Sequence, residues 1–87
     1  MARILIIEDE LPIGLGLEED LRRQGHEAEI VSDGEAGLRR GRNEVWGLIL
    51  LDVMLPKLDG FEVCRELRRA GVRTPILMLT ARVQEAE

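Results

Sequence analysis

Residues 48–52 read Leu-Ile-Leu-Leu-Asp, four apolar residues followed directly by a carboxylate. A continuous apolar run of this length is typical of a parallel strand whose two faces are both covered. Runs of the same length occur at residues 4–7, 28–31 and 76–79. The run at 28–31 follows Glu27 and alternates polar with apolar side chains, as an edge strand does. The sequence therefore predicts four strands, the second of them at an edge.

Segments with helical spacing separate these four strands. Their apolar side chains recur every three or four residues: Ile13, Leu17 and Leu21 in the first segment, residues 35–42 for the second, and Phe61, Cys64 and Leu67 in the third. The sequence Ser32-Asp33-Gly34-Glu35 is typical of a capping box at a helix start. Gly25 and Gly71 lie where the first and third helices are expected to end.

Strands that alternate with helices over short links predict a parallel sheet with right-handed crossovers and helices on both faces. If the strand order is 2-1-3-4, with the second strand at an edge, the fold is a flavodoxin-like, doubly wound α/β fold. The run at 76–79 has the character of an inner strand, yet only eight residues follow it. We therefore expect one partial domain over residues 1–87, cut off after the fourth strand.

Composition limits the classes of partner. The chain has 87 residues, 12 basic and 17 acidic, for a net charge of −5. This balance argues against direct nucleic-acid binding, which relies on clustered Lys and Arg. No apolar run is long enough for a membrane helix. The single cysteine, Cys64, cannot form an internal disulfide, so we expect a cytoplasmic protein.

Carboxylates follow two of the predicted strands. Glu8, Asp9 and Glu10 come directly after the first strand, and Asp52 ends the third. With strand order 2-1-3-4 these two strands are neighbours, and their carboxyl ends meet at the topological switch point where ligands bind. Crowded carboxylates repel each other unless one is protonated or a cation neutralises them. Helix capping alone does not explain acids at the ends of two neighbouring strands. A hard, oxygen-seeking cation such as Mg²⁺ suits this set of ligands.

Four motifs in chain order resemble one family across all 87 residues. They are Ile4-Leu5-Ile6-Ile7-Glu8-Asp9-Glu10, Leu48-Ile49-Leu50-Leu51-Asp52-Val53-Met54-Leu55-Pro56, Asp59-Gly60 and Leu77-Met78-Leu79-Thr80-Ala81. Together they are similar to the receiver domain of two-component response regulators. The sequence around Pro56 and Thr80 is most similar to that of regulators with a winged-helix DNA-binding output domain. No such domain is expected within residues 1–87.

The resemblance implies a role for each site residue. Asp52 would accept a phosphoryl group from a sensor histidine kinase, and Glu8 and Asp9 would form the acidic pair. Asp9, Asp52 and the Met54 carbonyl would hold Mg²⁺ beside Glu8, and Thr80 would be the switch hydroxyl. Such a domain is a signalling domain that controls a transcriptional output. It is not an enzyme, beyond metal-assisted self-phosphorylation.

The family pattern also includes a fifth strand and the last helices, which the resemblance implies that this partial domain lacks. That fifth strand carries an aromatic switch residue and ends in a lysine that contacts the phosphoryl group. The only lysine here is Lys57, which we interpret as an exposed loop residue. We therefore expect Asp52 to be modified poorly in this chain. An alternative function is a receiver-like interaction or dimerisation module that is not phosphorylated. The apolar run at 76–79 favours a homodimer through that edge of the sheet.

Two further functions fit less well. A flavin-binding flavodoxin-like protein needs a phosphate cradle after the first strand, where Glu8-Asp9-Glu10 would repel phosphate. An Asp-nucleophile phosphatase would, by its own family pattern, have a second Asp where this chain has Met54. We expect Cys64 in the core, His26 as a solvated turn residue, and Trp46 as an apolar anchor with a surface-facing indole N–H.

Overall fold

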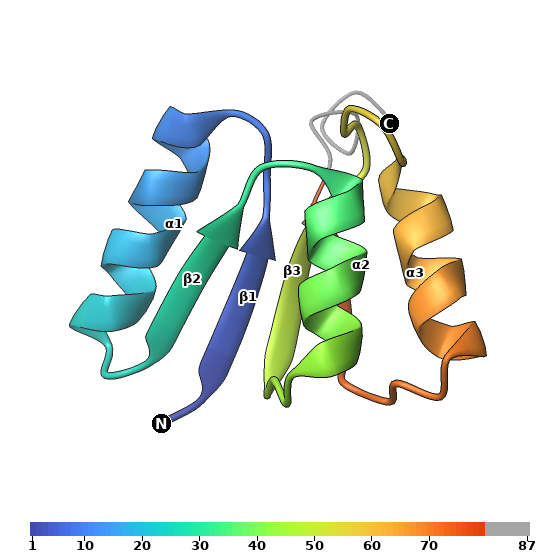
Figure 1. Cartoon of the computed structure of the whole chain (residues 1–87). Coiled ribbons are helices and arrows are strands. Elements are labelled where there is room, and N and C mark those ends of the chain that lie inside the picture. The colour runs from blue at the N-terminus through green and yellow to red at the C-terminus, as the bar shows by residue number, and fades with distance from the viewer. Residues whose placement is uncertain (80–87) are drawn as a thin grey trace, which may run out of the picture.

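Strands and helices alternate along the chain in the computed structural model, which describes residues 1–79. In chain order they are β1 (Arg3–Ile7), α1 (Leu11–Arg23), β2 (Glu27–Val31), α2 (Gly34–Asn43), β3 (Leu48–Asp52), α3 (Gly60–Arg69) and β4 (Ile76–Leu79) (Figure 1). All four predicted strands are confirmed. None of the helices in the described part of the chain has the length and apolar character that a membrane crossing requires.

The strands form one parallel sheet in the order β2-β1-β3-β4, which confirms the predicted doubly wound topology. In the register, Ile7 of β1 pairs with Val31 of β2 on one side and with Leu51 of β3 on the other. Asp52, the last residue of β3, pairs with Leu79 of β4. As predicted, β2 lies at an edge, and β1 and β3 lie side by side within the sheet.

The core has two layers because helices cover both faces of the sheet. On the face covered by α2 and α3, seven buried side chains, two of them from α3 itself, form one cluster: Leu5, Ile7, Trp46, Ile49, Leu51, Val63 and Leu67. On the other face α1 packs over a smaller buried set: Ile4, Ile6, Ala28 and Leu50. Each fully buried Leu or Ile contributes about 1.5–3 kcal/mol. This burial fixes the register of β1 and β3, and so the positions of the residues that follow them.

Local signals define the helix ends, with one correction. The cap of α2 is Asp33, whose carboxylate accepts a hydrogen bond from the Ala36 N–H at 2.8 Å. The predicted capping box, which starts at Ser32, is therefore displaced by one residue. Gly25 and Gly71 follow α1 and α3 with φ of +93° and +88°, conformations that side-chain-bearing residues rarely adopt.

The buried stripe of α3 also differs from the prediction. Phe61, expected inside, has 58% of its surface exposed, whereas Val63 and Leu67 are buried and Cys64 is half-buried against the core. The reason is that Gly60 occupies the first buried position, directly against the end of β3. Positions three, four and seven residues after Gly60 then face inward, and the residue next to it points away.

Similarly, α1 turns a different residue toward the sheet than expected. Ile13 is half exposed, although Leu17 and Leu21 do pack against the core. The neighbouring Gly14 is buried instead, because its backbone lies against the side chain of Ile30. The helix therefore contacts β2 through the backbone at Gly14, and the side chain of Ile13 does not take part.

At the amino ends of the strands, two predictions about polar groups are wrong. The indole N–H of Trp46 is buried and donates to the Arg40 carbonyl at 2.9 Å, and the guanidinium of Arg3 lies 4.0 Å from the ring centroid. His26 is half-buried, and its Nδ1 accepts a hydrogen bond from the Ala2 N–H at 3.0 Å. Ala2 lies 24 residues from His26, so local pattern gives no sign of that partner, and the Arg40 carbonyl meets the indole only because the chain turns back between α2 and β3.

Gly16 in α1 gives a test of this packing. A Cβ there would meet no atom within 4 Å, so the helix has a glycine with no packing reason for it. We expect Gly16→Ala to raise the free energy of unfolding, measured by urea denaturation, by roughly 0.5–1 kcal/mol. Gly14→Ala is the matched control, because its Cβ would lie 3.3 Å from Ile30. Equal stabilisation by both variants would contradict the packing described for α1.

Candidate metal centre

The sheet topology brings the carboxyl ends of β1 and β3 together. Ile7 and Leu51 are paired residues, so Glu8, which follows β1, lies beside Asp52, the last residue of β3. From this point the chain continues into α1 on one face and into α3 on the other. It is therefore the topological switch point of the sheet, the place where open α/β sheets bind ligands.

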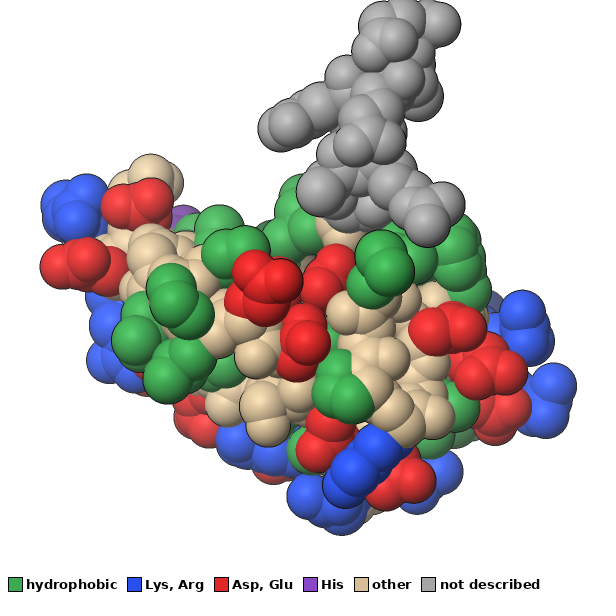
Figure 2. Space-filling model, turned by 90° about the horizontal axis from the view of Figure 1, so that it is seen from above, with side chains coloured by type: hydrophobic (Ala, Val, Ile, Leu, Met, Phe, Trp, Pro, Cys, Tyr) green, Lys and Arg blue, Asp and Glu red, His purple; other side chains and the backbone are tan. Residues whose placement is uncertain are grey.

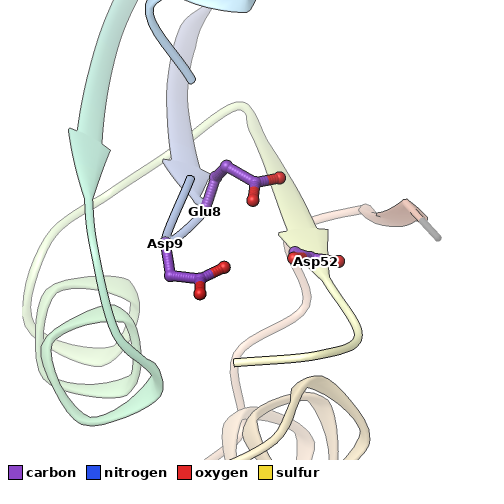
Figure 3. Close-up of side chains that lie close together, drawn as sticks. All are labelled: Glu8, Asp9 and Asp52. Atoms are coloured by element: carbon purple, nitrogen blue, oxygen red, sulfur yellow. The ribbon is translucent and has the colours of Figure 1, made fainter. Parts of the chain in front are cut away.

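Three of the predicted site residues meet there. Glu8 and Asp9 extend from the end of β1 toward Asp52 at the end of β3 (Figure 3). Each offers a carboxylate oxygen, and these oxygens all lie within 4.8 Å of one another. The cluster is graded in exposure, with Glu8 buried, Asp52 half-buried and Asp9 exposed. The predicted carboxylate cluster therefore exists as a geometric site.

The electrostatics of the cluster are dominated by Glu8, which is only 5% exposed. Burial, and after it the Asp52 and Asp9 carboxylates, raise the pKa of the Glu8 carboxyl from 4.5 to about 7. The Glu10 N–H, which donates to Glu8 Oε2 at 3.2 Å, lowers this pKa but does not outweigh burial. Near neutral pH the protein alone therefore keeps a proton on Glu8 for part of the time.

Basic side chains within residues 1–79 do not neutralise the cluster. Among residues 1–79, no Lys or Arg forms an ion pair with Glu8, Asp9 or Asp52. Lys57 is exposed, as predicted, and its Nζ lies 3.8 Å from Asp33 instead. The negative charge at this point is thus left for a proton or a bound cation to compensate.

The donor set fits a hard divalent cation. Three carboxylates offer only oxygen ligands, without the imidazole or thiolate that zinc or copper sites use. Met54 belongs to the loop that follows Asp52, and its N–H lies 3.4 Å from Asp52 Oδ1. The loop carrying the predicted carbonyl ligand is therefore adjacent to the cluster. The predicted switch residue Thr80 lies outside the described residues.

The acidic cluster opens beside an apolar hollow. Val53, Met54, Leu55, Pro56 and Phe61 line this hollow together with Asp9 and Asp59. Figure 2, which views this end of the molecule, shows acidic side chains in the middle of the face with hydrophobic side chains beside them. Sequence reasoning placed Phe61 in the core and so missed that it lines this hollow. The one signal in the sequence was the glycine directly before it, at the start of α3.

Comparison with known proteins agrees with this geometry. The profile of the response regulator receiver domain matches residues 4–87. The alkaline phosphatase synthesis transcriptional regulatory protein PhoP of Bacillus subtilis is 48% identical over 83 residues, which cover 95% of this chain and 35% of that protein. The transcriptional regulatory protein AfsQ1 of Streptomyces coelicolor is 50% identical over 82 residues, covering 94% of this chain and 36% of that protein. The chain thus spans about a third of the length of these relatives.

Solved structures with the same fold include proteins crystallised with magnesium. The response regulator TrrA of Thermotoga maritima, in complex with Mg²⁺-BeF, has a TM-score of 0.90 and 32% identity, covering 99% of this chain and 75% of that one. The receiver domain of the sensor histidine kinase PA1611 of Pseudomonas aeruginosa has magnesium in its active-site cleft. Its TM-score is 0.90 with 34% identity, covering 98% of this chain and 71% of that one. From its sequence match and its fold, this chain belongs to the receiver domain family of two-component response regulators.

Proposed function

We propose that this chain is a phosphoacceptor, in which Asp52 takes a phosphoryl group from a sensor histidine kinase in the cytoplasm. Glu8, Asp9 and Asp52, with the Met54 carbonyl, would hold Mg²⁺, and the phosphorylated state would control a transcriptional output. The observation that supports this function is the carboxylate cluster at the switch point, which no basic side chain in residues 1–79 neutralises. In this proposal the chain is a signalling domain and not an enzyme.

Asp52 is better suited than Glu8 to be the nucleophile. Glu8 is buried and carries a proton for part of the time near neutral pH, whereas Asp52 is half-buried at a strand end. In the proposed step an Asp52 oxygen forms a bond to phosphorus while the bond from phosphorus to the donor nitrogen breaks. The electron pair of that bond stays on the donor, which takes up a proton. When bound, Mg²⁺ would offset the repulsion between the carboxylate and the incoming phosphoryl oxygens.

We also propose Thr80 as the switch hydroxyl. Thr80 is the next residue after Leu79, and Leu79 pairs with Asp52 across β3 and β4. A hydroxyl at this point of the chain could donate to a phosphoryl oxygen on Asp52. Its role follows from the family resemblance, as does that of the Met54 carbonyl.

Magnesium in the active-site cleft of the PA1611 receiver domain supports the metal part of the proposal.

A second candidate function is self-association through β4. Within residues 1–79, β4 pairs with β3 on one side only, and Leu77 in its middle is 54% exposed. An apolar strand with unpaired backbone groups favours pairing with a second copy. This function would not require phosphorylation, so the two candidates can be separated by experiment.

Phosphorylation is tested by incubating the protein with acetyl phosphate and Mg²⁺ and measuring its intact mass. We expect the mass of one phosphoryl group to be added, and Asp52→Asn to abolish the gain because the amide cannot act as the nucleophile. The gain should be slow in this chain, since its only lysine, Lys57, is paired with Asp33 away from the cluster. A phosphoryl group mapped to another residue would contradict the assignment of Asp52.

Metal binding should depend on pH because Glu8 must lose its proton when a cation binds. We expect the Mg²⁺ affinity, measured by calorimetric titration, to rise as the pH increases through about 7. Glu8→Gln should remove this dependence, and Asp9→Ala should abolish binding. Trp46 lies at the opposite end of β3, so its fluorescence is a poor probe of this site. Unchanged binding by Asp9→Ala would show that the cation lies elsewhere.

Self-association is tested by light scattering over a dilution series. We expect a dimer that dissociates on dilution and is weakened by Leu77→Lys, which places a charge on the exposed edge. Val45→Lys is the control, because Val45 is also exposed but lies outside β4. A folded monomer at all concentrations would rule out this function for the chain.

A further inference from the structure

The start of α3 lies directly on the end of β3. The Gly60 N–H donates to the Val53 carbonyl at 2.8 Å. A Cβ at Gly60 would overlap the Asp52 carbonyl oxygen and would lie 2.8 Å from the Val53 Cα. The two ends of the loop between β3 and α3, residues 53–59, are therefore held together beside the proposed metal centre.

The middle of this loop contains a strained turn. The Leu58 N–H donates to the Pro56 carbonyl at 2.8 Å, which closes a three-residue γ-turn around Lys57. Lys57 has a φ of +72°, the one non-glycine residue with positive φ in the described part of the chain. A lysine keeps this conformation only where neighbouring structure holds it.

The amino end of α2 supplies that neighbouring structure. Gly34 is buried, and a Cβ on it would overlap the Leu58 carbonyl oxygen and lie 2.9 Å from the Leu58 carbonyl carbon. The adjacent Asp33 caps α2 with Oδ1, while its Oδ2 lies 3.8 Å from Lys57 Nζ. The segment after β2 thus contacts the loop at Lys57 and at Leu58, on the helix side of the turn.

We propose that Gly34 is a positioning residue for the metal centre, acting through the backbone of Leu58. Only glycine lets α2 approach close enough to hold the β3–α3 loop, and with it Met54 beside Asp52. The Met54 N–H already lies 3.4 Å from Asp52 Oδ1, so a small outward shift of the loop would lose this contact. This inference rests on the proposed function for its metal ligands, but Gly34 itself touches none of them.

Gly34→Ala tests the inference against Gly41→Ala, a matched substitution nearer the other end of α2. A Cβ at Gly41 would lie 3.1 Å from a terminal methyl of Leu67, a side chain that can adjust. In metal-free protein we expect Gly34→Ala to shift the backbone amide NMR signals of Met54 and Leu58. The Mg²⁺ dissociation constant should rise about 10-fold, as for other groups that orient metal ligands. Gly41→Ala should change neither quantity.

The outcomes separate the two proposals. If wild-type protein does not bind Mg²⁺, the metal part of the proposed function fails, and the amide shifts still test Gly34. If Gly34→Ala keeps both the Met54 amide signal and the wild-type affinity, the positioning role is wrong. Should Gly34→Ala fail to fold, Asp33→Ala loosens the same helix end without adding a Cβ beside Leu58. Unchanged hydrogen exchange of the Leu58 amide in that variant would overturn the inference.

Discussion

Repulsion between the carboxylates of Glu8, Asp9 and Asp52 is the constraint on which the site depends. The apolar strands bring these carboxylates together, because burial of β1 and β3 on both faces sets their register and leaves their last residues side by side. No basic side chain in residues 1–79 pairs with these carboxylates. A proton on Glu8 or a bound cation must therefore compensate the charge, and each option has a different consequence for function.

Charged side chains are paired at one end of the sheet and crowded without basic partners at the other, within residues 1–79. At the amino ends of the strands, Arg3 and Arg40 both bind Glu44, at 2.7 and 2.8 Å, and both stack against Trp46. Hydrogen bonds from Arg40 and then Arg3 lower the pKa of Glu44 to about 2. The charges of Arg3, Arg40 and Glu44 are therefore paired with one another. At the carboxyl ends, Glu8, Asp9 and Asp52 have no basic partner within residues 1–79, and Lys57 has a positive φ. Such departures from local consistency are expected where a protein binds something.

Sequence reasoning predicted the strands from the continuous apolar runs. The carboxylate cluster followed once strand order 2-1-3-4 was taken, because that order places β1 and β3 side by side. The same reasoning placed Phe61 wrongly, since a period of three or four residues fits more than one helix face and only the contact of Gly60 with β3 decides between them. The hydrogen bond between Ala2 and His26, the stacking of Arg3 on Trp46, and the contact of Gly34 with Leu58 join segments far apart in the chain. No local pattern encodes such contacts, so the sequence alone did not reveal them.

The most direct test is an NMR titration of the Glu8 side-chain carboxyl carbon, with and without Mg²⁺. Without the cation we expect a midpoint near pH 7, because burial and the neighbouring carboxylates favour the protonated form. With Mg²⁺ the midpoint should move toward acid, since a cation in the cluster stabilises the charged form. A midpoint near the ordinary value of 4.5 in both conditions would contradict the claim that this cluster carries uncompensated charge.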